Sequence, residues 1–290
     1  MLSIVITTFN RRDLLKKLLD SIDYTEGGDL EVVISDDGST DDTSNFLEQY
    51  LYDRKNDFSS KVLFDQNKGR ATALKRGLMT ASKRYTLIMD SDDVFIPGCL
   101  NYIIDTLKNR DLTDVVGICY LCEDFEGNIL GDEFPNDGIV ESYLKIRADF
   151  KVMGDKKEVV LTSIIKRNMY ELFNNERRIP TFYLWSKIDK EGKFLFKNKA
   201  IACKDYLPGG MSANINKIRM NSPSGSQTIY TNVFNSDSYG SISFRFKSAV
   251  NYYRYMLHGS NYDGKLQGRY ALRLLAIIPA VYYYYKDKKI

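Results

Sequence analysis

Residues 85–98 read YTLIMDSDDVFIPG, an apolar run that ends at Asp90 and continues as an acidic turn. The run is short and rich in large apolar side chains, which is typical of a buried β-strand. Three similar runs precede it along the chain: LSIVIT (2–7), LEVVIS (30–35) and KVLF (61–64). Helical patterns separate the four runs. This alternation predicts an α/β fold with a mostly parallel sheet and helices on both faces.

The helical patterns carry their own start signals. Asn10 is the predicted N-cap of the first helix, and Ser39 with Asp42 resembles a capping box before the second. The third helix is expected to begin after Gly69. Because each helix leads back to a parallel strand, the loops at the strand ends should all lie at one edge of the sheet.

Polar clusters follow all four predicted strands. They are TTFN (7–10), DDGS (36–39), QNKGR (66–70) and DSDD (90–93). In open parallel sheets, ligands bind beyond the carboxyl ends of the strands. The pattern therefore predicts one binding site assembled from these four loops.

The acids of DSDD favour a metal site. Asp90 and Asp92 lie two apart in an extended segment and can face one ion, and Asp93 can assist. Acids this close repel each other unless a cation neutralises them. With one histidine in the chain, carboxylates are the expected ligands, and these suit Mg²⁺ or Mn²⁺. The alternative is a solvated acidic turn that caps a helix.

Composition narrows the possible partners of the protein and the possible roles of its cysteines. A net charge of +3 gives no reason to expect nucleic acid as a partner. Cys119 and Cys122 form a lone CxxC in the predicted strand VVGICYLC (115–122), where residues three apart point to opposite faces. We therefore interpret the four cysteines as buried thiols, and with no visible signal peptide we expect a cytoplasmic protein.

The second half of the chain is less regular. A hairpin turn is expected at Gly127–Asn128, a strand and short helix within 158–173, and a helical segment that opens at Trp185. The Gly-, Asn- and Ser-rich segment 207–225 is interpreted as the end of the core. We expect a domain at 1–225, divided into a nucleotide-binding half (1–100) and an acceptor-side half (101–225), and a helical, aromatic and basic extension at 226–290.

The chain resembles family 2 glycosyltransferases, which have the Rossmann-like GT-A fold. The resemblance rests on IVITTFNRRDLLKKLLDSI (4–22), VVISDDGSTDDT (32–43), QNKGRATALKRGL (66–78) and YTLIMDSDDVFIPGCL (85–100). It continues more weakly through 196–217. It implies an enzyme that moves a hexosyl or N-acetylhexosaminyl group from a nucleotide-sugar to an acceptor hydroxyl.

The resemblance implies a role for each matching position. Thr7 and Phe9 correspond to contacts with base and ribose, and Asp37 to the acceptor of the uracil N3–H. An ionised carboxylate only accepts hydrogen bonds, so it suits uracil and favours a UDP-sugar. Arg70 falls where some relatives place a basic residue against the nucleotide. Asp90 matches the ribose or metal position, and Asp92 matches the metal ligand.

The catalytic base is where the sequence departs from the family. Relatives carry an acid shortly before the tryptophan of the block that resembles IPTFYLW (179–185), and Thr181 stands there. Glu176 and Asp205 are the nearby candidates for the base, and either is equally well read as a surface acid. A displaced base, an altered acceptor or a weakly active enzyme all remain open. The resemblance implies inversion at the anomeric carbon.

Two other functions compete with this one. A nucleotide-sugar-binding pseudo-enzyme is motivated by Thr181. A sugar-phosphate nucleotidyltransferase needs a glycine-rich phosphate loop after the first strand, and TTFNRR has no glycine.

The C-terminal segment YALRLLAIIPAVYYYY (270–285) is too short and interrupted to span a bilayer. It is expected either to pack on the core or, because tyrosines adjoin KDKK, to contact the inner face of the cytoplasmic membrane peripherally. The resemblance implies a saccharide or lipid-linked saccharide acceptor in cell-surface polysaccharide or glycoconjugate assembly.

Overall fold

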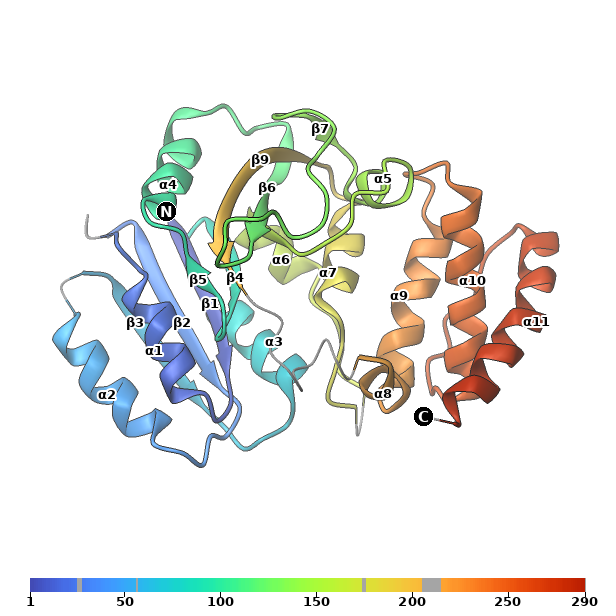
Figure 1. Cartoon of the computed structure of the whole chain (residues 1–290), viewed down its shortest axis with the longest axis horizontal. Helices are drawn as coiled ribbons and strands as arrows, with labels where there is room; N and C mark the ends of the chain where they lie inside the picture. Colours follow the sequence, from blue (N-terminus) through green and yellow to red (C-terminus); the bar gives the residue numbers. More distant parts are fainter. Residues whose placement is uncertain (25–27, 56, 174–175, 205–214, 290) are drawn as a thin grey trace. The chain divides into compact units, whose positions relative to one another are not determined.

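The computed structural model describes residues 1–24, 28–55, 57–173, 176–204 and 215–289 (Figure 1). The chain divides into two compact units. Unit 1 comprises Met1–Glu141, Val152–Met169 and Glu191–Asp205, and unit 2 comprises Ser142–Lys151, Tyr170–Lys190 and Tyr206–Ile290. Each unit is described separately below.

Unit 1 begins with the predicted alternation of strands and helices, which the structure confirms. The strands are β1 (Leu2–Thr8), β2 (Leu30–Asp36), β3 (Ser59–Phe64) and β4 (Tyr85–Asp90). The helices between them are α1 (Arg12–Asp20), α2 (Thr43–Asp53) and α3 (Arg70–Thr80). All pairings among these four strands are parallel, so their carboxyl ends lie at one edge.

The sheet then becomes mixed. Its further elements in unit 1 are β5 (Val94–Phe95), α4 (Cys99–Asn109), β6 (Val115–Glu123), β7 (Val140–Glu141), β8 (Lys156–Leu161), α6 (Thr162–Arg167) and β9 (Lys193–Cys203). Among the described residues the strand order is β3-β2-β1-β4-β8-β6-β9-β5, with β7 paired to β9. β8 runs antiparallel to both β4 and β6.

Helices cover both faces of the sheet, as the sequence predicts. Ile4 and Ile6 of β1 belong to the core that also holds the buried leucines of α1 and α2 and the apolar side of α4. Val5 points to the opposite face, where α3 packs against β1 and β2. Figure 1 shows α1 and α2 on one side of the strands and α3 on the other.

Two predicted helix caps are wrong. α1 begins at Arg12 without a side-chain cap, because the Asn10 side chain accepts a hydrogen bond from the Thr40 N–H at 2.7 Å instead. α2 begins at Thr43, and Asp41 rather than Ser39 accepts from its N–H. Asn10 thus joins the loop after β1 to the loop after β2, a contact between residues 30 apart in sequence.

The predicted elements of the second half are present. A turn at Asp124–Asn128 joins β6 to Ile129, and β8 is followed directly by α6. The helix predicted to open at Trp185 begins earlier, at Thr181. The proposed domain boundary at residue 225 stays a prediction, and that residue lies inside a helix of unit 2.

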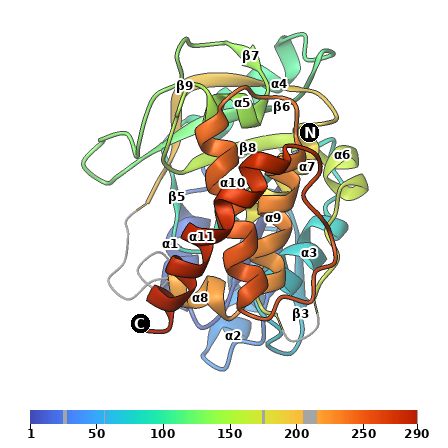
Figure 2. The same ribbon diagram turned by 90° about the vertical axis from the view of Figure 1, so that its right-hand side faces the viewer.

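Unit 2 is helical in its described residues. Its helices are α5 (Tyr143–Ala148), α7 (Thr181–Ile188), α8 (Ile215–Met220), α9 (Pro223–Asn235), α10 (Ile242–Leu257) and α11 (Tyr270–Asp287). α10 packs against α9 on one side and α11 on the other. Figure 1 shows the three in the order α9, α10, α11, and Figure 2 views them with α11 in front. In the part of the chain that the structure covers, every helix is too short or too polar to cross a membrane.

Candidate functional site

The parallel register brings three strand ends together. Thr7 of β1 lies opposite Ser35 of β2 on one side and Asp90 of β4 on the other. Thr7 is buried, whereas Phe9 just beyond the strand is 41% exposed. The clusters that the sequence predicts to converge therefore share one edge of unit 1.

Asp37 anchors the loop before α3. Its carboxylate accepts hydrogen bonds from the backbone N–H groups of Lys68 at 2.9 Å and Gly69 at 2.9 Å. The loop after β2 approaches closely, since a Cβ added to Gly38 would lie 2.6 Å from the Asn67 nitrogen. Gly38 also has a φ of +80°, which favours glycine. Asp37 thus fixes where α3 begins.

Two arginines meet the acids at the end of β4. Arg70, the first residue of α3, places its Nη2 2.5 Å from Oδ1 of Asp90. Arg11, just before α1, places its Nη1 2.8 Å from Oδ2 of Asp92. The two carboxylate side chains remain 27% and 25% exposed. The edge therefore presents charges of both signs to solvent.

Asp93 has different surroundings from its neighbours. It is fully buried and forms an ion pair with Lys157 of β8. Lys204 lies 3.6 Å from its other oxygen and 2.8 Å from Asp155. Buried acids are normally paired in this way, because an isolated buried charge is costly. The assignment of Asp93 as a metal ligand stays a prediction, and in this structure its partners are two lysines.

The cations shift the titration of this cluster. Burial works to raise the pKa of Asp90, but Arg70, Lys157 and Lys204 outweigh burial and hold that pKa well below its usual range. Burial works to lower the pKa of Lys157, yet Asp93 and Asp90 raise it overall. Asp90 is therefore an anion at neutral pH, and Lys157 is a cation.

Sequence reasoning missed these basic partners. It predicted that a bound cation must neutralise the acids of DSDD, whereas Arg11, Arg70 and Lys157 already do so. Arg11 stands inside the quoted TTFNRR motif. Lys157 had one usable signal, since the charged KKE (156–158) directly precedes the apolar VVL of the same strand. In the structure, the three charged residues of this KKE segment, Lys156, Lys157 and Glu158, are buried.

The site fits a divalent cation bound jointly with a ligand. Asp90 and Asp92 supply hard carboxylate oxygens and stay partly exposed. Among the described residues there is no set of three or more His, Cys, Asp or Glu side chains arranged to hold a metal unaided. Mg²⁺ is commonly bound by one or two carboxylates together with water and substrate phosphate, so two carboxylates suffice.

The candidates for the catalytic base belong to unit 2 or are not described. The Glu176 carboxylate accepts from the N–H groups of Ser224 and Gly225, both at 2.7 Å, at the start of α9. This contact satisfies N–H groups that a helix start leaves without intrahelical partners. Thr181 begins α7, in which Trp185 is buried. Asp205 lies outside the described residues. The roles of Glu176 and Asp205 as bases stay predictions.

The cysteines take no part in this site. Cys99, Cys119 and Cys122 are buried and Cys203 is half-buried, and all four are free thiols. Burial raises the pKa of Cys122 to about 12, so this thiol stays protonated and is a poor metal ligand. The interpretation of the cysteines as buried thiols is confirmed for Cys99, Cys119 and Cys122.

Comparison with known proteins assigns the family. Residues 3–158, more than half of the chain, match the model described as Glycosyl transferase family 2. A GalNAc(5)-diNAcBac-PP-undecaprenol beta-1,3-glucosyltransferase of Campylobacter jejuni is 29% identical over 228 residues, covering 75% of this chain and 70% of that protein. Glycosyltransferase GlyG of Streptococcus pneumoniae is 25% identical over 199 residues, covering 63% of this chain and 65% of GlyG.

Solved structures show the same fold. The crystal structure of S. aureus TarS 1–349 superposes with a TM-score of 0.62 at 16% identity, over 97% of this chain and 80% of that chain. The family match, the curated relatives and the fold agree with one another. The chain belongs to glycosyl transferase family 2 and is a glycosyltransferase with the GT-A fold.

Proposed function

We propose that this enzyme transfers a sugar from a UDP-sugar to an acceptor hydroxyl, with the donor held at the carboxyl edge of unit 1. The observation that carries the proposal is the register of β1, β2 and β4, which places Thr7, the Asp37 loop and Asp90 along one edge. Phe9 adds an exposed aromatic ring at the same strand end, suited to stacking on a base.

The acidic turn is proposed to bind Mn²⁺ or Mg²⁺ through Asp90 and Asp92. When bound, the metal would act as a Lewis acid for the leaving diphosphate. The solved structure of a mannosyltransferase from Pyrobaculum calidifontis is in complex with GDP-Man and Mn²⁺, and its likeness to this chain is in fold alone. What supports the metal here is the donor set: two partly exposed carboxylates two residues apart.

The basic residues are proposed to hold the diphosphate. Arg11 and Arg70 bring two guanidinium groups to the edge where the donor phosphates are expected. Guanidinium groups recognise phosphate oxygens through paired N–H donors. Lys157 is buried against Asp93, so its role is to keep the turn in place.

Uridine recognition is assigned to Asp37. Its carboxylate already orders the loop before α3 through backbone N–H groups. An ionised carboxylate accepts hydrogen bonds and does not donate them, which suits the N3–H of uracil. TarS has been crystallised with UDP and with UDP-GlcNAc, which is consistent with a uridine donor in this fold.

The acceptor is proposed to be a saccharide, in the lipid-linked class that the name of the Campylobacter relative describes. Its hydroxyl would attack the anomeric carbon opposite the leaving group and invert that centre, with Glu176 or Asp205 as the candidate base. Glu176 is the weaker candidate, because its carboxylate is engaged at the start of α9.

A donor panel tests this proposal. UDP-, GDP- and dTDP-sugars are incubated with the enzyme, Mn²⁺ and a mixture of lipid-linked saccharides, and nucleoside diphosphate release is measured. We expect release from UDP-sugars only. Binding of UDP-sugar without turnover on any acceptor would identify the pseudo-enzyme, and pyrophosphate release from UTP with a sugar phosphate would identify a nucleotidyltransferase.

A further inference from the structure

Helix α11 carries its large apolar side chains on the outside. Ala276 and Ala280 are fully buried against α10, whereas Leu274 is 67% exposed and Ile278 is 79% exposed. We call the outward side the α11 face. Its members are Tyr270, Leu274, Leu275, Ile278, Val281, Tyr282 and Tyr285. A helix that only completes a core has the reverse pattern, so packing on α10 does not explain this sequence.

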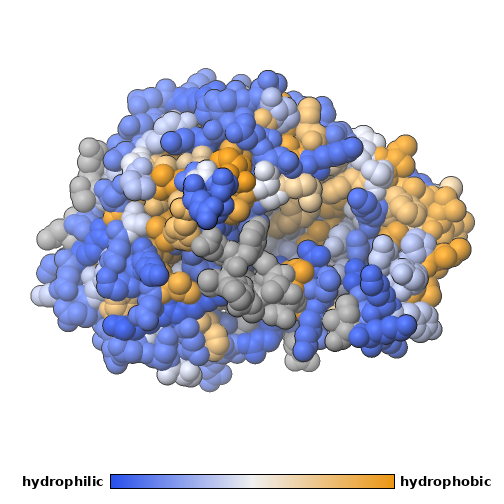
Figure 3. All heavy atoms as spheres, viewed as in Figure 1, coloured by the Kyte–Doolittle hydropathy of each residue, from blue (hydrophilic) through white to orange (hydrophobic). Residues whose placement is uncertain are grey.

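The α11 face is continuous and uncharged. Its residues recur at helical spacing from Tyr270 to Tyr285, and Arg273, the only charged residue between them, is half-buried. Figure 3 shows apolar atoms gathered over α10 and α11. Contiguous exposed apolar surface of this kind marks an interaction site.

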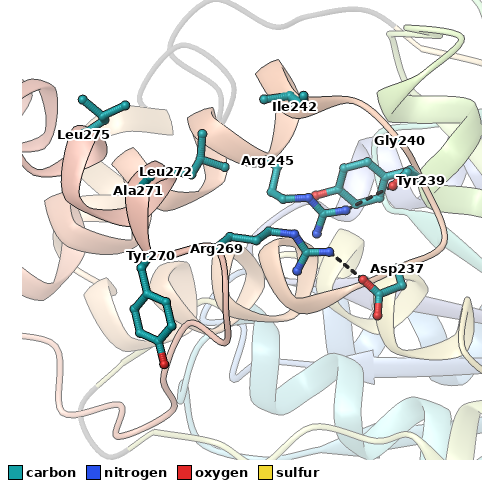
Figure 4. Close-up of a pocket in the computed structure, with 10 residues that line it drawn as sticks. All are labelled: Asp237, Tyr239, Gly240, Ile242, Arg245, Arg269, Tyr270, Ala271, Leu272 and Leu275. Carbon is teal, nitrogen blue, oxygen red and sulfur yellow. Dashed lines mark hydrogen bonds and ion pairs between the residues drawn. The ribbon is translucent and has the colours of Figure 1, made fainter.

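The α11 face continues onto a pocket of about 730 Å³ at the N-terminal ends of α10 and α11 (Figure 4). Ile242, 72% exposed, and Leu275 line it. Its two arginines are already engaged, since Arg245 donates to backbone carbonyls and Arg269 pairs with Asp237. The pocket therefore extends the apolar surface and offers no uncommitted cation to a small anionic ligand.

The exposed charges at the C-terminal end of the α11 face have one sign. Lys286, Lys288 and Lys289 are exposed at its C-terminal end. The only acid in 269–289, Asp287, is buried and paired with Arg254 and His258. A second copy of this chain packed in parallel on the same face would bring cations toward cations, whereas an anionic lipid surface complements them in any orientation of the helix along it.

The exposed tyrosines of α11 also favour a lipid surface as the partner. Tyr270, Tyr282, Tyr283 and Tyr285 are exposed along the helix. Tyrosine has an apolar ring and a polar hydroxyl, and it suits the boundary between headgroups and acyl chains. α11 is not apolar enough to cross a bilayer, so it would lie along the surface.

We propose that the α11 face docks this enzyme onto an anionic bilayer surface, with Leu274 and Ile278 entering the acyl boundary and the terminal lysines contacting lipid phosphates. The inference rests on unit 2 alone and does not depend on the identity of the donor.

Vesicle co-sedimentation of the full chain tests the proposal. Vesicles contain equal parts of phosphatidylglycerol and phosphatidylcholine, or phosphatidylcholine alone. Wild type should bind the anionic vesicles more tightly, and added salt should weaken that binding. The double variant Leu274→Glu, Ile278→Glu should lose roughly tenfold or more in partitioning. Replacing Lys286, Lys288 and Lys289 by Gln should cost about fivefold for each lysine.

Tyr52→Glu is the matched control, because Tyr52 is 65% exposed on α2 of unit 1 and should leave binding unchanged. Thermal melting checks that every variant is folded. Absence of wild-type binding to anionic vesicles overturns the proposal, as does unchanged binding by the double variant. A dimer in sedimentation velocity that the double variant disperses, without any vesicle binding, would assign the face to a second copy instead.

Discussion

Asp37 has a structural role before any ligand binds. Its carboxylate holds the N–H groups of Lys68 and Gly69, so a substitution changes the loop as well as the proposed uracil contact. Asp37→Asn keeps an acceptor oxygen for the loop but removes the charge. We expect it to weaken UDP binding by about 1–3 kcal/mol in calorimetry, the range for a charge-assisted hydrogen bond, with a smaller loss of melting temperature than Asp37→Ala.

Asp37→Ala is the companion variant. It removes both contacts and should lower UDP affinity and melting temperature together. UDP affinity equal to wild type in Asp37→Asn would remove Asp37 from the nucleotide site, whatever the melting temperatures show.

The lowered pKa of Glu31 leads to a prediction of how the stability of the protein depends on pH. Burial works to raise its pKa, but Lys61, Ser3 and Ser82 lower it from 4.5 to about 2. A lowered folded-state pKa gives stability that is present above pH 4.5 and is lost as the pH falls toward 2. The shift corresponds to at most about 3 kcal/mol.

Glu31→Gln should therefore be less stable than wild type in urea unfolding at pH 7, and the difference should shrink as the pH falls from 5 to 3. Asp13→Asn, which changes an acid whose side chain is 85% exposed, is the control. A difference that stays constant across this pH range would show that the charge of Glu31 contributes nothing.

Individual site residues could be predicted from the sequence where they lie at the end of an apolar run. Thr7, Asp37, Asp90 and Asp92 follow apolar runs, and a strand end is visible in the sequence itself. The partners of these acids were not predictable. Lys157 is 64 residues from Asp93, and nothing in a single sequence states which distant cation a carboxylate will meet.

At the level of elements, the first four strands were predicted to within two residues at either end. β1, β2 and β4 are buried parallel strands, which are continuous apolar runs, whereas β3 lies at the sheet edge with exposed or half-buried side chains. The position of β8 between β4 and β6 was not predicted. β8 is short and opens with three charged residues, so its burial depends on partners such as Asp93 rather than on its own pattern.

The packing of α3 on β1 supplies a prediction for this interface. A Cβ at Gly77 would lie 2.7 Å from Cγ1 of Val5, so glycine lets the helix approach the sheet. Gly77→Ala should destabilise unit 1 by roughly 1–3 kcal/mol in urea unfolding through overpacking. Adding Val5→Ala removes the clashing methyl groups.

The double variant Val5→Ala, Gly77→Ala should thus be more stable than the sum of the single effects predicts, by about 0.5 kcal/mol or more. Strict additivity would show that α3 moves freely to accommodate the methyl group, and would contradict the close contact.

At the scale of the whole molecule, the described donor-site residues lie in unit 1 and the α11 face lies in unit 2. The two proposed binding activities should therefore be separable. We expect the Leu274→Glu, Ile278→Glu variant to bind UDP with wild-type affinity in calorimetry. A large loss of UDP affinity would show that α11 supports the donor site as well.

The central claim is that the acidic turn after β4 binds the donor through a divalent metal. The most direct test titrates UDP into wild type and Asp92→Asn with Mn²⁺, with Mg²⁺ and with a chelator. Asp92 is partly exposed and pairs with Arg11, so its loss should cost at most about 1 kcal/mol of stability and leave the fold intact.

We predict that wild type and the control Asp13→Asn bind UDP in the presence of metal and lose most of that binding with the chelator. Asp92→Asn should bind weakly and equally with or without metal. UDP binding by wild type that is indifferent to chelation, or metal-dependent binding that survives in Asp92→Asn, would contradict the account.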